Sequence, residues 1–252
     1  MPTKGFTTSG GRRVSFYDPD LSSGYSANLW KSCPLLEYMF DPSIGCLLNE
    51  VFTSYNAAAT TGDYTLTQAT AGSAAMSTTE PCTLSIDSGS TTVVQGANVQ
   101  RQKSMFIPAA GKHIWAEFRV KWTGVGALNV ETFVGLSELD TTIIATSAVS
   151  TSNHIGWSSV TDDGVLLFDA EKAGAGTPVA ATTLASDTWV RLGFYVNGVT
   201  GIDQYINGVL TGSGFATANI PIVAIYPSFV CQSGGTDQPV LHVGGYRIFQ
   251  LR

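Results

Sequence analysis

Two acidic side chains one residue apart, Glu138 and Asp140, are the part of this sequence best suited to acid–base chemistry. Hydrolysis of a glycosidic bond needs two carboxyl groups about 5 to 9.5 Å apart, which act as acid and as base or nucleophile. Asp140 is followed by Thr141 and Thr142, a sequence typical of a strand that ends in a turn. We therefore expect a solvated loop at this pair and no enzymatic activity.

Three histidines are the next candidates for chemistry, as metal ligands or as proton carriers. His113, His154 and His242 lie far apart in the sequence, and none is part of an HxH or HExxH motif. Each lies in or beside an expected strand, so we interpret them as strand-edge residues. No glycine-rich phosphate loop opens a helix either, and we expect no cofactor and no metal.

Two acidic turns supply oxygen atoms of the kind that calcium prefers. They are residues 162–164 (Asp-Asp-Gly) and residues 18–20 (Asp-Pro-Asp). Asp-Gly and Asp-Pro are also ordinary turn sequences, because aspartate bonds to its own backbone and glycine accepts positive φ angles. We favour turns over ion sites at both places.

The low charge and the lack of long apolar stretches argue against nucleic-acid binding, membrane spanning and secretion through a signal peptide. Of its 252 residues only 13% are charged, and the net charge is −6. Nucleic-acid binding requires clustered lysine and arginine, whereas Arg12-Arg13 and the Arg101/Lys103 pair are sparse. No stretch approaches about 18 consecutive apolar residues, and no signal-peptide core follows Met1, so we expect neither a membrane span nor secretion by that route.

Apolar residues alternate with other residues in many short segments, which predicts an all-β protein. In residues 114–122 every second side chain from Ile114 is apolar, and residues 190–196 repeat the pattern from Val190. Asn-Gly pairs at 197–198 and 207–208 are typical of tight hairpin turns. These spacings predict a β-sandwich. The other expected strands are 64–67, 83–87, 98–100, 103–107, 132–136, 155–157, 165–169, 222–230 with a bend at Pro227, and 240–251, with a loop at 170–183.

Aromatic side chains divide between a core and a partner surface. Trp122 falls on the apolar face of its strand, whereas Trp115 and Tyr195 fall on the opposite faces of theirs. Outward aromatic residues are frequent anchors in protein interfaces, and a glycan would also stack on them. We expect Trp115 and Tyr195 to contact a partner, and most of the other aromatic candidates to fill the core, namely Trp30, Trp122, Trp157, Trp189 and Tyr205.

Residues 1–50 differ in pattern from residues 51–252, which form the predicted sandwich domain. The first 50 residues are rich in turn formers, yet they hold more aromatic and aliphatic residues than a disordered tail would. We expect an extended N-terminal arm, with a short helical turn at 35–40, that packs on the domain or on a neighbouring subunit. Its expected anchors are Phe16, Tyr17, Trp30, Leu36 and Phe40.

Four cysteines, Cys33, Cys46, Cys82 and Cys231, are scattered along the chain without a CxxC pair. We interpret them as buried free thiols, with Cys33 and Cys46 as the one pair that a short loop would allow to bond.

Several phrases of residues 50–252 resemble tailed-bacteriophage virion proteins that carry a concanavalin-like jelly-roll domain. They include the strand pattern GK-x-x-aromatic-x-E-x-R-V at 111–120 and W-x-x-x-G-F-x-V-N-G at 189–198. The resemblance implies a lectin-like jelly-roll fold and a structural role. Glucanases of this fold carry E-x-D-x-x-E on one strand, and the position of the last glutamate is Ile143 here.

The resemblance implies a capsid decoration protein that binds and stabilises the phage head through protein contacts. Its expected partners are the major capsid protein and further copies of the chain, and its expected location is the capsid surface after synthesis in the host cytoplasm. The alternative is an adhesive virion protein that recognises host glycans.

Overall fold

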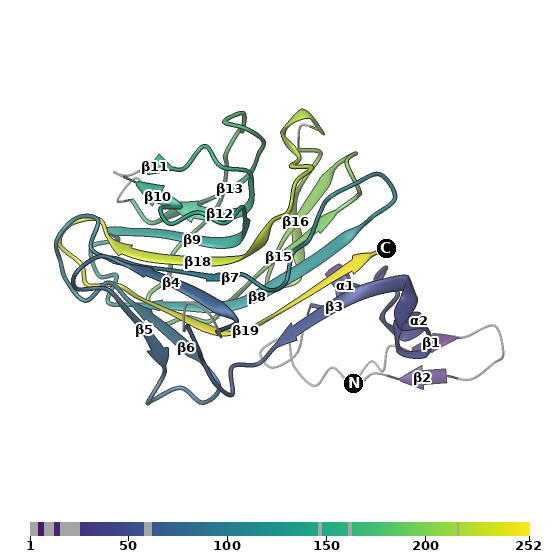
Figure 1. The fold of residues 1–252 in the computed structure, drawn as a ribbon, viewed down its shortest axis with the longest axis horizontal. Helices are drawn as coiled ribbons and strands as arrows, with labels where there is room; N and C mark the ends of the chain where they lie inside the picture. The colour runs from purple at the N-terminus through teal and green to yellow at the C-terminus, as the bar shows by residue number, and fades with distance from the viewer. Residues whose placement is uncertain are drawn as a thin grey trace.

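The chain folds into two antiparallel β-sheets that face each other across one hydrophobic core (Figure 1). The structure is a computed structural model that describes residues 26–57, 62–145, 148–160, 163–215 and 217–252, together with the short paired strands β1 (Gly5–Thr7) and β2 (Arg13–Ser15). Strands make up 50% of it and helices 7%. The predicted all-β sandwich is confirmed.

The first sheet has eight strands in the order β17-β16-β15-β8-β19-β6-β5, with β3 attached to the edge of β19. β19 is its longest strand and pairs with β8 over most of its length. The strands are β3 (Gly45–Glu50), β5 (Ser73–Met76), β6 (Leu84–Asp87), β8 (Ile114–Thr123), β15 (Val190–Val196), β16 (Ile202–Ile206), β17 (Val209–Ser213) and β19 (Val240–Leu251).

The second sheet has seven strands in the order β14-β13-β12-β9-β18-β7-β4. Consecutive strands β12, β13 and β14 form hairpins, whereas β18 is inserted between β9 and β7. The strands are β4 (Tyr64–Gln68), β7 (Gly96–Arg101), β9 (Val130–Ser137), β12 (His154–Ser159), β13 (Val165–Glu171), β14 (Val179–Thr183) and β18 (Tyr226–Ser233).

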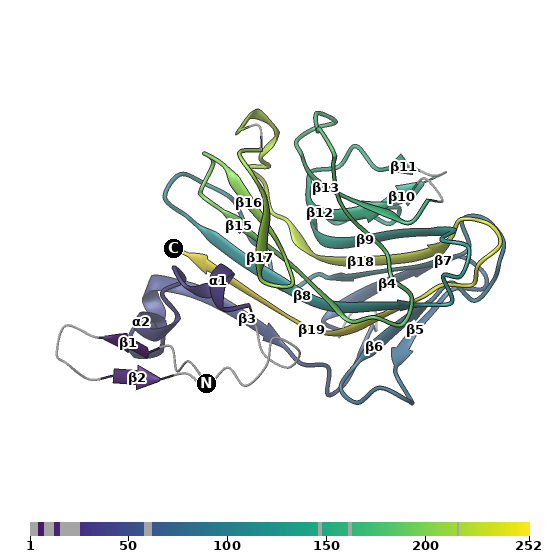
Figure 2. The same cartoon turned by 180° about the vertical axis from the view of Figure 1, so that it is seen from behind.

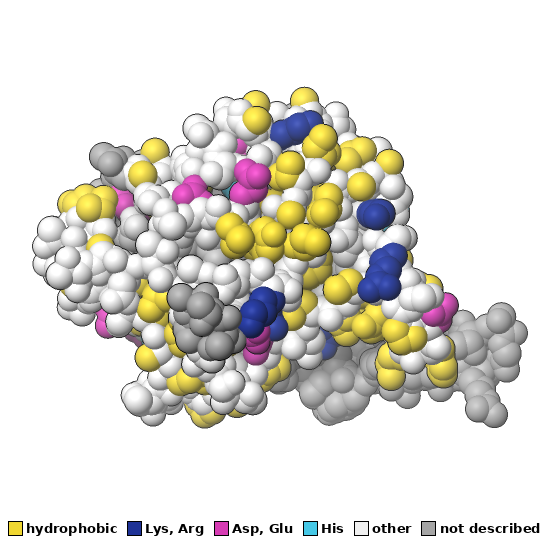
Figure 3. Space-filling model, viewed as in Figure 1, with side chains coloured by type: hydrophobic (Ala, Val, Ile, Leu, Met, Phe, Trp, Pro, Cys, Tyr) yellow, Lys and Arg dark blue, Asp and Glu magenta, His cyan; other side chains and the backbone are white. Residues whose placement is uncertain are grey.

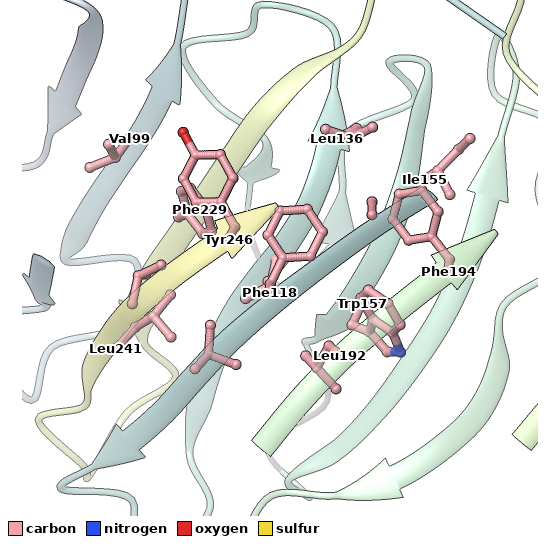
Figure 4. Packing of buried hydrophobic residues seen from close by; sticks show 14 of the residues in the cluster. Val99, Phe118, Leu136, Ile155, Trp157, Leu192, Phe194, Phe229, Leu241 and Tyr246 are labelled. Atoms are coloured by element: carbon pink, nitrogen blue, oxygen red, sulfur yellow. The ribbon is translucent and has the colours of Figure 1, made fainter. Parts of the chain in front are cut away.

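The core lies between the sheets and is built from the alternate residues that the sequence predicts to face inward (Figure 4). Phe118 from the eight-stranded sheet meets Phe229 from the seven-stranded sheet edge to face, with ring centroids 5.9 Å apart. Trp157 of the seven-stranded sheet also meets Phe194 of the eight-stranded sheet, in a tilted arrangement with ring centroids 5.8 Å apart. All four rings are fully buried, so the two sheets are joined by aromatic contacts.

Two smaller parts cover the outward faces of the sheets (Figures 1 and 2). A hairpin of β10 (Ile144–Ala145) and β11 (Ala148–Val149) lies over β9, where it adds to a cluster with Phe133 and Val230. On the other side, helices α1 (Ala27–Trp30) and α2 (Leu35–Phe40) and the 3₁₀ turn η1 (Pro42–Ile44) precede β3. A second turn, η2 (Thr217–Asn219), precedes β18. The predicted helical turn at residues 35–40 is confirmed.

Two predictions of local structure are wrong, at residues 103–107 and 170–183, and the strand predicted at 222–230 is correct only from residue 226. Residues 103–107 form no strand, and only Phe106 bridges to Ile225. Residues 222–225 likewise precede β18 as irregular chain, and β18 passes through Pro227. The expected loop at 170–183 contains β14, which pairs with β13 at an exposed edge. Short apolar runs did not distinguish strand from loop, because pairing depends on a neighbouring strand.

The four cysteines are all free thiols. Cys231 is buried and Cys33 is half-buried, but Cys46 and Cys82 are exposed, so the expectation of buried thiols is correct only in part. Among the described residues, no helix is both long and apolar enough to cross a membrane.

Candidate functional site

The outward face of the seven-stranded sheet carries a row of polar side chains at one end. Strand register places Tyr226 of β18 beside Ser137 of β9, Ser137 beside His154 of β12, and His154 beside Glu171 of β13. The neighbours of Ser137 and His154 along their strands, Leu136 and Ile155, point the other way and belong to the core. Four strands therefore bring four polar side chains to the same side, although these residues span 90 positions of sequence.

An open, shallow hollow of about 400 Å³ lies beside this row. Its lining combines an aromatic ring and apolar groups with polar groups, namely Tyr226, Leu139, Ala224, Glu138 and Ser152. In the view of Figure 3, hydrophobic side chains gather where β18 begins, and acidic side chains lie next to them. The hollow thus offers an apolar surface and oxygen acceptors side by side.

Glu138 and Asp140, the predicted carboxylate pair, both hold the loop that follows β9. Glu138 Oε2 accepts hydrogen bonds from the backbone N–H and side-chain amide of Asn153, at 3.1 and 2.7 Å. Asp140 Oδ2 accepts from the hydroxyls of Ser150 and Ser152, at 2.8 and 2.9 Å. Both carboxylates are half-buried rather than fully solvated, so the expected loop is present but is tied down by them.

The electrostatics of Asp140 agree with this structural role. Burial raises the pKa of Asp140, but hydrogen bonds from the Thr142 N–H and from Ser150 and Ser152 outweigh burial and hold that pKa below its usual value. Ile143, at the position where a third carboxylate would complete the glucanase pattern, is buried in the apolar cluster below the β10–β11 hairpin.

Gln100 of β7 connects the loop to the sheet. Its side-chain N–H groups donate to the hydroxyls of Ser137 and Ser228 and to the carbonyl of Glu138, and its oxygen accepts from the N–H of Asp140 at 2.8 Å. The loop that forms one wall of the hollow is therefore positioned by hydrogen bonds from the sheet.

His154, Asp169 and Glu171 form a second group on the same face. Each of the three side chains offers one nitrogen or oxygen atom that could bind a metal, and these three atoms lie within 4.8 Å of one another. His154 and Asp169 are buried and Glu171 is half-buried. Burial lowers the pKa of His154 and raises the pKa of Asp169, and it raises that of Glu171 with a further contribution from the charge of Asp169. Among the described residues, this is the one group of three such side chains within that distance.

The other two histidines have ordinary hydrogen-bond partners. His242 lies between the hydroxyls of Ser85 and Thr123, at 3.0 and 3.1 Å. His113 stacks on Tyr195, whose hydroxyl lies 2.8 Å from its Nδ1. The strand-edge interpretation fits His113, which precedes β8, but His242 lies within β19 between β6 and β8, and the interpretation omits the carboxylates that accompany His154.

The turn sequence at residues 162–164 could have predicted that His154 lies beside Glu171. Asp163 accepts the N–H of Val165 and Gly164 has a φ of +67°, as expected for a turn. A hairpin centred there pairs His154 with Glu171, because both lie equally far from the turn. Asp162 and residues 18–20 lie outside the described residues.

Neither a protein-family model nor a curated protein matches this sequence. Solved structures do match its fold. The carbohydrate recognition domain of Emp47p aligns with a TM-score of 0.57 and 8% identity, over 83% of this chain and 98% of that one. Peanut lectin in complex with a 9mer peptide aligns with a TM-score of 0.56 and 10% identity, over 82% and 98%. Bacillus licheniformis β-glucanase aligns with a TM-score of 0.53 and 12% identity, over 81% and 98%.

The fold is a concanavalin-like jelly roll. At these identities the similarity establishes the fold alone, and the same fold occurs in lectins and in a glucanase. The predicted fold class is confirmed, and the three matches do not indicate a bacteriophage origin or a virion role.

Of the seven predicted partner-binding residues, the five that the structure describes lie in three environments. Trp30 and Trp115 are buried in one cluster with Leu29 and Phe249, where the chain's own N-terminal segment packs on the sheet. Leu36 and Tyr195 are half-buried, and Phe40 is 83% exposed at the end of α2. Phe16 and Tyr17 lie outside the described residues. Partner binding by these seven residues stays a prediction.

The N-terminal segment, residues 26–44, is attached to the jelly roll by Glu117. This carboxylate is buried on the outward face of β8, where it accepts hydrogen bonds from the N–H and hydroxyl of Ser26 and from Trp30 Nε1. Strand β3 follows and pairs with β19, so residues 45–50 are part of the eight-stranded sheet. The sequence predicted the outward direction of residue 115 and an arm that packs on the domain or on a neighbouring subunit, but it did not predict that this arm covers Trp115.

Proposed function

We propose that this protein is a non-catalytic carbohydrate-binding protein and that the hollow beside Tyr226 receives the glycan. The observation that carries the proposal is the lining of the hollow, in which Tyr226 and Leu139 lie next to the carboxylate of Glu138 and the hydroxyl of Ser152. Sugar rings have the same division, with apolar C–H faces and hydroxyl edges.

The two kinds of lining would have separate roles. Tyr226 is half-buried, and a tyrosine ring combines an apolar face with a polar hydroxyl, which suits stacking against a sugar. Glu138 Oε2 is occupied by Asn153, and a carboxylate has further lone pairs that accept hydrogen bonds from sugar hydroxyls. The shallow, open form of the hollow favours the end or the side of a glycan rather than a small molecule enclosed on all sides.

The carboxylates near the hollow support binding rather than hydrolysis. Asp140 is occupied by Thr142, Ser150 and Ser152 and has a lowered pKa, which is unsuitable for a general acid. Ile143 provides no third carboxylate. Carbohydrate recognition domains and lectins of the same fold support the binding function as an analogy of fold.

A glycan array with the purified full chain tests the proposal, followed by titration of the best ligand against Tyr226→Ala and Tyr195→Ala. Tyr195 is also half-buried but lies on the outward side of the other sheet. We expect Tyr226→Ala to weaken binding about tenfold or more, equivalent to about 1.4 kcal/mol, and Tyr195→Ala to leave it unchanged. Absence of any array signal, or a loss confined to Tyr195→Ala, would contradict the proposal.

A second proposed function is the decoration of a phage capsid, with the protein located on the virion surface. It is favoured by the exposed apolar side chains of α2, since Met39 is 73% and Phe40 is 83% exposed. In this proposal α2 contacts the major capsid protein or another copy of the chain.

Co-sedimentation with tailed-phage capsids that lack a decoration protein tests this second function. We expect saturable binding that Phe40→Ser weakens, and higher survival of the particles on heating. A protein that remains in the supernatant would contradict capsid decoration, and a light-scattering mass of one chain would contradict self-association.

A further inference from the structure

We propose that His154, Asp169 and Glu171 form a binding site for one divalent transition-metal ion. The proposal goes beyond carbohydrate binding and does not depend on it, because these three side chains lie outside the lining of the hollow. It rests on the geometry of the three side chains, on the groups that orient them, and on their charge.

The sheet fixes the geometry of the three side chains. His154 and Glu171 are directly opposite each other on β12 and β13, and Asp169 lies two residues before Glu171 on the same face of β13. Their ligand-type atoms lie within 4.8 Å of one another. Atoms bound to one ion at about 2.0 to 2.2 Å are separated by no more than about twice that distance, so small side-chain movements would complete the site.

The imidazole of His154 is oriented as in a metal ligand. Its Nδ1 lies 2.8 Å from the carbonyl oxygen of Ser152, and a carbonyl only accepts, so Nδ1 carries the proton. Nε2 then has a free lone pair, and among the described residues no hydrogen bond reaches it. The side chain is 2% exposed and packs edge to face on Phe133, which restricts rotation of the ring. A histidine ligand usually donates its other N–H to a carbonyl or carboxylate in this way.

Asp169 is also held in place. Its Oδ1 accepts the N–H of Thr177 at 3.0 Å, from the turn between β13 and β14. Gly176 of the same turn lies so close that a Cβ there would be 2.5 Å from Asp169 Oδ2. The turn therefore covers Asp169 closely and leaves the half-buried Glu171 as the side open to solvent.

The charge of the group is uncompensated. Two carboxylates face one neutral imidazole, and within the described part of the chain no lysine or arginine forms an ion pair with Asp169 or Glu171. Burial of anionic groups without a countercharge is costly, and a divalent cation would remove that cost.

The ligand types select the class of ion. One imidazole nitrogen with two carboxylate oxygens suits Zn²⁺ and similar first-row ions, whereas Ca²⁺ and Mg²⁺ prefer oxygen ligands alone. Three protein ligands leave a fourth position for water on the open side at Glu171.

Calorimetric titration of the chelator-treated full chain with ZnCl₂, and separately with CaCl₂, tests the site. We expect one Zn²⁺ per chain, much weaker binding of Ca²⁺, and a Tm that rises with Zn²⁺ concentration. Glu171→Gln should weaken Zn²⁺ binding by at least about tenfold, and His154→Asn by at least as much.

Two comparisons keep the outcome interpretable. His242→Gln is the matched control, because both ring nitrogens of that histidine already have hydroxyl partners on the other sheet, and it should bind Zn²⁺ like the original chain. Glu171 is half-buried, so Glu171→Gln tests the site even where a change at the buried His154 prevents folding. No saturable Zn²⁺ binding, or equal binding by Glu171→Gln and the original chain, would overturn the proposal.

Discussion

Ser26 donates its backbone N–H to the buried carboxylate of Glu117 at 2.9 Å, across 91 residues of sequence. Trp30 donates its indole N–H to the same oxygen at 3.1 Å. One acidic residue in the middle of β8 therefore fixes the start of the N-terminal segment to the outward face of the sheet, and Trp115 is buried beneath it.

Replacement of Glu117 should release this segment. Glu117→Ala leaves buried donors of Ser26 and Trp30 without an acceptor, and we expect a loss of about 2 to 5 kcal/mol in the free energy of unfolding. Urea denaturation measures the loss, and limited proteolysis should show faster cleavage within residues 26–44. An unchanged cleavage rate would mean that packing on Phe249 and Trp115 holds the segment without Glu117.

The same residue should make stability depend on pH. Burial raises the pKa of Glu117, and this outweighs the donors and Arg191, which lower it. Since the folded-state pKa lies above the unfolded value of about 4.3, the contribution of Glu117 is full below that value and is lost as pH rises through the raised pKa. The stability of Glu117→Gln relative to the original chain should therefore increase with pH, as measured by denaturation at pH 4 and pH 8.

Gly193 should be intolerant of a side chain, because α1 packs directly on it. A Cβ at this position would lie 2.6 Å from Leu29 Cδ2, and Leu29 is itself buried. We expect Gly193→Ala to cost about 1 to 3 kcal/mol by overpacking and to loosen residues 26–44 toward proteases. Gly201→Ala is the control, because nothing lies within 4 Å of its Cβ position. Equal effects of the two changes would contradict the close contact.

His242 should contribute a pH dependence of the opposite sign. Burial and the positive charge of Lys121 lower its pKa, so its contribution to stability is present above the unfolded value of about 6.5 and is lost as pH falls through the folded value. The difference in unfolding free energy between the original chain and His242→Gln should decrease from pH 8 to pH 5. A difference that stays constant over this range would show that His242 has an unshifted pKa.

Two of the four thiols should react readily with an alkylating reagent, and the other two should be protected by burial. Cys46 and Cys82 are exposed, whereas burial raises the pKa of both Cys33 and Cys231 and disfavours the reactive thiolate. Brief iodoacetamide treatment followed by mass spectrometry of the peptides should find label on Cys46 and Cys82 first. Early label on Cys231 would indicate that the core opens near β18.

Much of the fold could be predicted from local patterns. Alternation in residues 114–122 and 190–196 correctly identified the inward faces of β8 and β15, because a strand buried on one side must place its apolar residues at every second position. Residues 240–251 were predicted as one strand and form β19 over that whole range. Where apolar runs were short, as at 103–107, the pattern was insufficient.

The candidate site was harder to predict, because alternation says which way a side chain points but not what lies beside it. Glu138 and Asp140 were identified as chemically notable, yet only the loop partners Asn153, Ser150 and Ser152 show them to be structural. Tyr226 reaches the same row as His154 because β18 is inserted next to β9, far from it in sequence.

The sequence by itself determined the class of fold and the faces of its principal strands, because alternation and turn residues act locally. The tertiary structure decided which outward faces are covered and which polar residues become neighbours. Trp115 points outward from its strand but is buried by residues 26–44, and His154 meets Asp169 and Glu171 through strand pairing. Both results depend on hydrogen-bond register and on packing between distant segments, which no local pattern contains.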